Sequence, residues 1–330
     1  MDWSPAVTYG FIAFLSGFLG GWVMAALAPR LHLIDVPNER SSHTQPVAKG
    51  GGVGLLAAFV MTGILLRIPL SFVVPLGVLS VVSFAGDRWH IPPIVRLIVQ
   101  TVAAVCVVGS VFLRGAGIGG GTILVLILGV VYLVGTANMY NFMDGIDGIA
   151  GITGFVGFAL LAAYLFLSGR FVPFGLLALC LSLSCAGFLL WNVPRARVFM
   201  GDVGSILLGS AFAATALFVS STVYDVAVIS LLIFPFYADE ITTATLRLRD
   251  GENLLRPHRR HLYQVLANEC GVPHWKVTAG YGAVQFLMGC GALFLAVYEQ
   301  GMLLAAFISA GIGGWIILSC YVRRGAVRHS

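Results

Sequence analysis

The chain has 330 residues, of which 58% are hydrophobic and only 10% are charged, and its mean hydropathy is +0.94. Soluble domains carry about 25% charged residues, so this composition excludes a soluble enzyme or binding module and indicates an integral membrane protein. The net charge of +5 predicts contact with anionic headgroups or phosphorylated ligands and argues against nucleic acid as a partner.

Apolar runs long enough to cross a bilayer, about 17–25 residues, follow one another along the whole chain. Tilted or partly re-entrant segments are alternatives for the two short runs that flank Arg67. No linker or low-complexity tract divides the chain, so we expect one all-α membrane domain over residues 1–330, with about 10–11 transmembrane helices. The eleven predicted runs lie near 5–29, 51–66, 69–86, 94–113, 121–137, 149–168, 172–192, 204–222, 226–245, 277–298 and 301–321.

The positive charges fall almost entirely on one set of loops. Of the 19 lysines and arginines, only Arg67, Arg114 and Arg170 lie on the other set. Because cytoplasmic loops carry the excess of lysine and arginine, the eleven spans predict an N-terminus outside and a C-terminus in the cytoplasm. All seven histidines lie on the cytoplasmic side in this arrangement.

The most informative polar segment lies between two apolar runs and reads Asn138-Met-Tyr-Asn141-Phe-Met-Asp144-Gly-Ile-Asp147-Gly148. In a helix, four polar side chains at steps of three residues lie roughly along one stripe. Charged groups are costly at a bilayer edge, and two carboxylates with two carboxamides are too many polar side chains for helix caps alone. The segment therefore suits a divalent cation and a phosphorylated ligand.

A basic loop precedes the second apolar run. It carries Arg40, His43 and Lys49, and a glycine triplet (50–52) opens the run. Glycines before a helix N-terminus let backbone N–H groups approach a phosphate, so we interpret this loop as a phosphate contact. A loop held by anionic lipid, with glycines for close helix packing, is the alternative.

Two single carboxylates also lie at predicted span ends. Asp87 follows the third run, where it has the pattern of a helix cap or of an ion-pair partner for Arg88. Asp202 begins the eighth, where it is either a cap or a cation ligand together with Asp144 and Asp147.

The largest loop carries His258, Arg259 and His261. The two histidines are spaced i, i+3 and would share a face in a helix. Zinc would need a third ligand that is not evident nearby, so the intervening arginines favour phosphate binding. Carboxylates, cations and glycines on one membrane face together suit phosphoryl transfer at a membrane surface.

These motifs resemble those of the polyprenyl-phosphate N-acetylhexosamine-1-phosphate transferases, which include the lipid-carrier enzymes of peptidoglycan and O-antigen synthesis. The resemblance covers about residues 30–275, and the motif wording is closer to the O-antigen-initiating branch than to the muramyl-pentapeptide branch. The matching segments are Asp35–His43, Pro46–Gly52, Asp87–Gln100, Asn138–Gly148, Phe199–Ser205 and His258–Gln264.

The resemblance implies a bacterial inner-membrane enzyme with a cytoplasmic active site, often dimeric. It would transfer a sugar-1-phosphate from a UDP-N-acetylhexosamine to undecaprenyl phosphate, with Mg²⁺ or alternatively Mn²⁺, and release UMP to begin cell-surface polysaccharide synthesis. It implies catalytic roles for Asp87, Asp144, Asp147, His258 and His261, substrate contacts from Arg40, His43, Lys49, Asn138, Asn141 and Arg259, and metal ligation by Asp202 and Asp147.

One departure bears on activity. The family carries an Asp-Asp pair where this chain has Gly86-Asp87, and glycine can act neither as a base nor as a nucleophile. A catalytically impaired or regulatory nucleotide-sugar-binding paralogue is therefore the alternative to an active transferase. A transporter is disfavoured because the polar residues gather at one set of span ends.

Overall fold

The computed structural model describes residues 4–37, 41–89, 91–115, 122–254, 258–298 and 300–329. Within these residues, nine helices are long and apolar enough to cross a membrane. The predicted all-α, polytopic membrane architecture is confirmed. The nine helices are α1 (Ser4–Leu27), α3 (Leu70–Trp89), α4 (Pro93–Gly115), α5 (Thr122–Phe142), α6 (Ile149–Leu167), α7 (Val172–Asn192), α8 (Asp202–Val219), α12 (His274–Val297) and α13 (Gly301–His329).

The two remaining predicted runs are helical but are not simple straight spans. Helix α2 (Val53–Leu65) has only 13 residues, a length of about 20 Å, which is less than the roughly 30 Å of a bilayer core. The run near 226–245 forms α9 (Val223–Leu231) and α10 (Phe234–Arg249), which are bent by 92° at the break between them. A proline at the second position of α10, Pro235, is compatible with a new helix start there.

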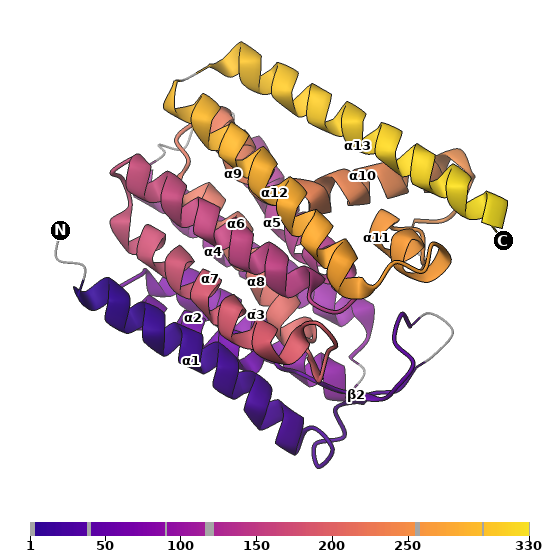
Figure 1. Ribbon diagram of the computed structural model, residues 1–330. Coiled ribbons are helices and arrows are strands. Elements are labelled where there is room, and N and C mark those ends of the chain that lie inside the picture. Colours follow the sequence, from indigo (N-terminus) through magenta and orange to yellow (C-terminus); the bar gives the residue numbers. More distant parts are fainter. Residues whose placement is uncertain are drawn as a thin grey trace.

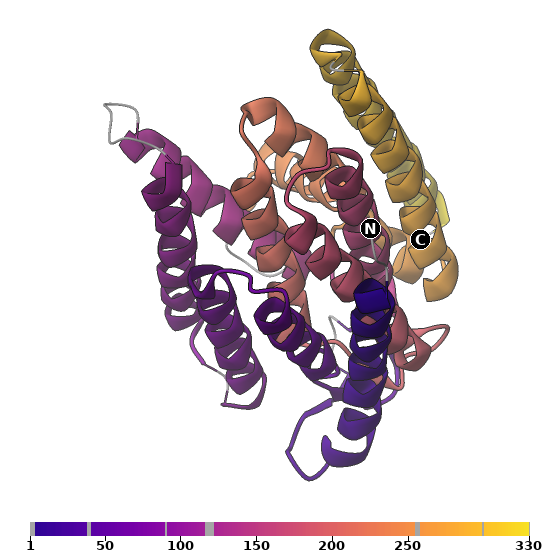
Figure 2. The same cartoon turned by 90° about the vertical axis from the view of Figure 1, so that its left-hand side faces the viewer.

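Helix α8 is the centre of the bundle, because nearly all of its residues are buried and it contacts α3, α4 and α5. Helix α1 packs on α7 and α2, and α12 packs on α6. Figure 1 shows α1 and α13 along opposite edges, with the start of α1 and the end of α13 on opposite sides. In Figure 2, α3 and α4 (purple) lie on one side and α12 and α13 (gold) on the other.

Small residues let α2 reach α8. A Cβ atom built on Gly52 would lie 2.4 Å from the Gly204 Cα atom, so a side chain at position 52 would push the two helix starts apart. Lipid tails are as apolar as the helix surfaces, and close packing at small residues therefore holds such helices together. This packing brings the loop before α2 against the start of α8.

A small sheet continues this contact. Strands β1 (Ile34–Asp35) and β2 (Val47–Lys49) pair antiparallel, and β2 pairs parallel with β3 (Val198–Phe199). Lys49 is in register with Phe199, three residues before Asp202. The sheet therefore places the loop lysine beside the α8 N-terminus.

Asn192, at the end of α7, joins two loops that run beside this end of the bundle. Its carboxamide oxygen accepts a hydrogen bond from the Gly148 N–H at 2.8 Å, and its nitrogen donates to the Val198 carbonyl oxygen at 2.8 Å. The Asn192 side chain and both backbone partners are buried. One amide thus connects the start of α6 to β3.

Replacing Asn192 with alanine would leave both buried backbone groups without this partner. An unsatisfied buried polar group costs about 1–3 kcal/mol, so we expect N192A to lower the free energy of unfolding by about 2–4 kcal/mol, measured by denaturant unfolding of the protein in detergent. S309A, which removes a side-chain hydrogen bond from the exposed face of α13, serves as the control. Equal stability of the two variants would contradict the role given to Asn192.

Candidate active site

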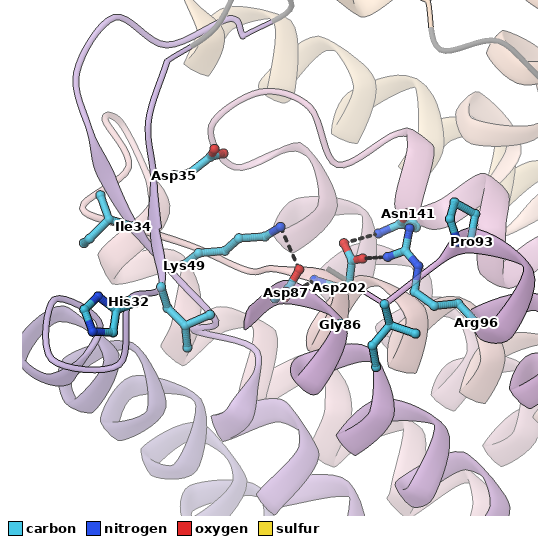
Figure 3. Close-up of a pocket in the computed structure, with 12 residues that line it drawn as sticks. His32, Ile34, Asp35, Lys49, Gly86, Asp87, Pro93, Arg96, Asn141 and Asp202 are labelled. Atoms are coloured by element: carbon cyan, nitrogen blue, oxygen red, sulfur yellow. Dashed lines mark hydrogen bonds and ion pairs between the residues drawn. The ribbon is translucent and has the colours of Figure 1, made fainter. Parts of the chain in front are cut away.

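Two neighbouring cavities open at one end of the bundle. The larger, of about 590 Å³, lies between the small sheet, the end of α3 and the start of α4. The smaller, of about 270 Å³, extends toward the α5–α6 loop and the start of α12. Both cavities are lined by Asp35, Lys49, Asn141 and Asp202, so they form one continuous polar site, part of which Figure 3 shows.

Asp87 is held by two contacts at the floor of the larger cavity. One carboxylate oxygen lies 2.7 Å from the Lys49 Nζ atom, and the other accepts the Asp202 backbone N–H at 3.0 Å (Figure 3). Asp87 therefore caps α8 and pairs with Lys49, in place of the predicted alternatives of capping its own helix or pairing with Arg88. Its side chain is only 1% exposed, so the loop lysine is the cation that compensates this buried charge.

The ammonium group of Lys49 is stabilised in return. Burial disfavours its charged form, but the carboxylates of Asp202 and Asp87 outweigh that effect and raise the pKa of Lys49 above its ordinary value. Lys49 therefore remains a cation through the neutral pH range, as a phosphate contact requires.

Asp202 is the first residue of α8, as the sequence predicts. One carboxylate oxygen accepts from the Asn141 side-chain nitrogen at 2.9 Å, and the other forms an ion pair with Arg96 (Figure 3). Arg96, on α4, is a site residue that the motif reasoning did not select. The sequence signal for Arg96 was its position, because it is the fourth residue of the helix that begins shortly after Asp87.

The Asn138–Asp147 segment is not one helical stripe, and that expectation is wrong. Helix α5 ends at Phe142, and the residues that follow form a loop into α6. Gly148, the residue before α6, adopts a left-handed conformation with φ of 83°, which favours glycine and forms part of the turn into α6. Asn138 consequently donates to Gln100 on α4 at 2.6 Å, while Asn141, Asp144 and Asp147 line the smaller cavity.

Asp144 is a carboxylate of the site with little compensation from the protein. Among the described residues, no hydrogen bond or ion pair is recorded for its side chain. Burial, together with the carboxylates of Asp202 and Asp87, raises the pKa of Asp144 to about 7 in spite of the opposing effect of Lys49. A group so placed would be stabilised as an anion by an added cation.

Asp147 is positioned by the first turn of α12. Its carboxylate lies 3.2 Å from the His274 Nδ1 atom, and its carbonyl oxygen accepts from the Thr278 hydroxyl at 2.7 Å. His274 also lines the smaller cavity, although it was not among the predicted site residues. His274 follows a proline at the start of a predicted span. This pattern indicates a helix N-terminus, and in the structure that N-terminus faces the site.

His258 and His261 do not share a helical face, because α11 (Leu262–Gln264) begins only after them. Their ring centroids are nevertheless 4.8 Å apart. Burial, and next His261 and Arg247, lower the pKa of His258 to about 4, so this imidazole is neutral at pH 7. A neutral ring can offer a phosphate a hydrogen bond but no charge.

Asp239 fixes the loop that carries these histidines. It is fully buried and accepts from the Leu262 N–H at 2.8 Å and the Tyr281 hydroxyl at 2.6 Å. His261 lies 3.7 Å from Asp239, and its side chain is 3% exposed. Neither His258 nor His261 is in the lining of the two cavities, whereas Gln264, the last residue of α11, lines the smaller one.

The remaining predicted contacts have different outcomes. His43 lines the smaller cavity and packs edge-on against the Phe199 ring at 4.9 Å. Arg259 follows His258 in the loop before α11, and neither cavity's lining includes it. Arg40 lies outside the described residues.

A magnesium ion at this site would have to be held in part by its substrate. Among the described residues, no three His, Cys, Asp or Glu side chains form a metal-binding group. Magnesium typically takes one or two protein carboxylates and completes its shell with phosphate and water. The undercompensated Asp144, with Asp147 or Asp202 beside the same cavity, meets that requirement, whereas a site built wholly from protein ligands is not present in this part of the chain.

The fold and this site define a polytopic membrane protein with a cluster of carboxylates and cations at one end of its bundle. The chain belongs to glycosyl transferase family 4, whose model matches residues 69–220. It is 30% identical to a decaprenyl-phosphate N-acetylglucosaminephosphotransferase of Mycolicibacterium smegmatis, over 77% of this chain and 73% of that protein.

Two further relatives have related names. An undecaprenyl-phosphate alpha-N-acetylglucosaminyl 1-phosphate transferase of Thermotoga maritima is 28% identical over 87% of this chain and 90% of its own. A phospho-N-acetylmuramoyl-pentapeptide-transferase of Shouchella clausii is 27% identical over 53% of this chain and 52% of its own. The family resemblance inferred from the motifs is therefore confirmed.

The chain has only two lysines, Lys49 and Lys276, which gives an internal reference for the charge pairing. Only the neutral amine reacts with an acylating reagent, and a raised pKa lowers its fraction about tenfold per unit. At pH 8.5 we therefore expect Lys49 to be acetylated roughly tenfold or more slowly than Lys276, measured by peptide mass spectrometry.

The Asp87→Asn variant tests whether the neighbouring charge, and not burial alone, slows the acetylation of Lys49. It removes one of the carboxylates that hold the Lys49 ammonium, so Lys49 should become more reactive while Lys276 does not change. An unchanged Lys49 rate in this variant would contradict the electrostatic explanation.

Proposed function

We propose that this protein transfers an N-acetylhexosamine-1-phosphate from a UDP-sugar to a polyprenyl phosphate, giving a lipid-linked diphosphate sugar and UMP. The observation that carries the proposal is the array of Asp87, Lys49, Asp202 and Arg96 beside the uncompensated Asp144, at the end of a membrane-spanning bundle. Two phosphorylated substrates, one of them a lipid, require such an array of charges at a membrane surface.

The names of the relatives support both substrates. The Mycolicibacterium smegmatis and Thermotoga maritima proteins are named for decaprenyl and undecaprenyl phosphate as acceptors and for N-acetylglucosamine as the sugar. We infer the same donor and acceptor classes here. Undecaprenyl phosphate in the bacterial inner membrane, a cytoplasmic site and initiation of an O-antigen-type polysaccharide follow from the motif resemblance, as does a homodimer.

The chemistry is an exchange at one phosphorus atom. An oxygen of the lipid phosphate forms a bond to the sugar-bearing phosphorus of the donor, and the bond from that phosphorus to the UMP oxygen breaks. The acceptor is already anionic near neutral pH, since the second pKa of a phosphomonoester is about 6. The protein's work is therefore to place two anions next to each other and to offset their repulsion.

Residues at different positions in the site have different roles in this reaction. Lys49 and Arg96, which line the larger cavity, supply positive charge to the phosphates. Asp144, with Asp147 or Asp202, would hold Mg²⁺, which would neutralise negative charge on the diphosphate. His274 and Thr278 orient Asp147, and Asn141 orients Asp202.

Gly86 stands where the family has the first aspartate of its pair, and a side chain there would press against Arg96. A Cβ atom there would lie 3.3 Å from the Arg96 Cδ atom and 3.9 Å from the Ile91 Cβ atom. An aspartate at this position would therefore stand beside the arginine that now pairs with Asp202. In this chain no carboxylate at position 86 competes with Asp202 for Arg96. This supports an active site that functions without the first aspartate of the family pair.

The direct test uses purified protein, undecaprenyl phosphate, Mg²⁺ and a panel of UDP-N-acetylhexosamines that includes UDP-GlcNAc, UDP-GalNAc, UDP-QuiNAc and UDP-FucNAc. We expect UMP release with at least one donor, because the charge array and both cavities are intact. Absence of UMP with every donor, in a preparation that remains folded, would refute the transferase function.

Asp202→Asn should lower turnover by about a hundredfold or more, the usual order for removing an electrostatic contact from an active site. It takes away the charge that pairs with Arg96 and faces the cavity, while membrane insertion should be retained. Asp250→Asn, an exposed loop carboxylate that pairs with Arg260 at 2.5 Å, is the matched control and should stay within about twofold of the wild type. Similar rates for the two variants would show that Asp202 has no catalytic part.

Gly86→Asp distinguishes an active enzyme from an impaired paralogue. If the protein is active as proposed, the wild type turns over and the added carboxylate changes the rate little or lowers it by drawing Arg96 away from Asp202. The paralogue interpretation instead requires no turnover in the wild type and measurable UMP release from the variant.

A further inference from the structure

A third cavity lies at the end of the bundle opposite the candidate active site. The site is built at the first residues of α6, α8 and α12, whereas this cavity is lined by the last turns of the same three helices and by the loops that follow α6 and α8. Its volume is about 670 Å³. Because these helices are candidate membrane spans, the cavity lies near the other face of the membrane.

The wall of this cavity is divided by polarity. Leu165, Val219, Leu293 and Val297 form an apolar side toward the interior of the bundle, while the loops and the first turn of α9 contribute hydroxyl groups and two charges. A molecule that fills it must therefore have an apolar part that enters between helices and a polar part at the membrane interface. Membrane lipids have this construction.

Arg170 supplies the positive charge. It lies in the short connection between α6 and α7, where its backbone N–H donates to the Ser168 hydroxyl at 3.3 Å. The side chain is exposed, and among the described residues no ion pair is recorded for its guanidinium group. Arg170 is thus available to an external anion at the rim of the cavity.

Asp225 supplies the negative charge, and its position is fixed. Its carboxylate accepts the backbone N–H groups of Ser221 and Thr222, each at 2.9 Å, and forms a capping box at the start of α9. The Tyr164 hydroxyl donates to its other oxygen at 3.1 Å. These neutral donors hold the carboxylate in place without cancelling its charge.

We propose that this cavity binds a zwitterionic phospholipid with a primary ammonium, of the phosphatidylethanolamine class. The lipid phosphate binds Arg170, the ammonium group faces the Asp225 side, and an acyl chain lies along Leu165, Leu293 and Val297. An anionic phosphatidylglycerol would satisfy Arg170 but would leave Asp225 without a cation. The methylated ammonium of phosphatidylcholine cannot donate hydrogen bonds to the carboxylate or to the loop hydroxyls.

The test is lipid retention by the purified full-length protein, measured by native mass spectrometry with equimolar mixtures of the three lipid classes at matched chain length. We expect the wild type to retain phosphatidylethanolamine in preference to the other two. Arg170→Gln should weaken that retention about tenfold, the loss expected for one charge-assisted hydrogen bond. Arg67→Gln, at an arginine that is not part of the lining of this cavity, is the control and should retain the lipid as the wild type does.

Asp225→Asn keeps acceptor oxygen for the helix cap but removes the negative charge, so it tests lipid selectivity apart from folding. We expect this variant to lose its preference for phosphatidylethanolamine over phosphatidylglycerol. Equal retention of all three lipids by the wild type, a preference for phosphatidylglycerol, or full retention by Arg170→Gln would each overturn the proposal. These results are independent of UMP release, so the transferase function stands or falls separately.

Discussion

The site depends on how a membrane bundle compensates carboxylates that its helix ends bring together. Asp87 and Asp202 both lie where helices meet, and an uncompensated charge there would be costly. The structure places Lys49 on one and Arg96 on the other, while the N-terminus of α8 adds the Asp202 N–H to the Asp87 contact. Each cation comes from a different part of the chain, so the pairing also holds the small sheet against α3 and α4 against α8.

The carboxylates beside the smaller cavity are not fully compensated by protein cations. The charges of the site are therefore distributed unevenly between the two cavities. Arg96 lines the larger cavity and Lys49 lines both, whereas Asp144 and Asp147 line the smaller one. A diphosphate with a bound cation has the complementary arrangement, with negative oxygens for the cations and positive charge for the carboxylates. Gly86 shifts this balance in favour of the Arg96–Asp202 pair, because no second aspartate competes for the guanidinium group.

The two ends of the bundle use their charges differently. At the active-site end, charges are numerous, mostly paired across elements and partly buried. At the other end, Arg170 on a loop and Asp225 in the first turn of α9 lie around a cavity that is apolar on its inner side. The first arrangement suits soluble phosphates that must be brought together, and the second suits one amphipathic molecule that stays in place.

Composition and the length of the apolar runs determined the membrane class, the all-α fold and the approximate bounds of the helices, because these follow from local hydrophobicity. Motif order determined the family and the positions of Asp87 and Asp202 at helix ends. The loop structure of Asp144 and Asp147 could not be derived in this way, since a spacing of three suits a helix until Gly148 and the Asn192 contact define a turn.

Only the tertiary structure decided which charges meet. Lys49 and Asp87 are 38 positions apart and Arg96 and Asp202 are 106 positions apart in the chain, and nothing in local spacing selects these pairs over Asp87 with Arg88. His274 was likewise invisible as a site residue, because its contact with Asp147 depends on the packing of α12 against α6. The sequence alone determined where polar groups occur along the chain, and helix packing at close range determined their partners.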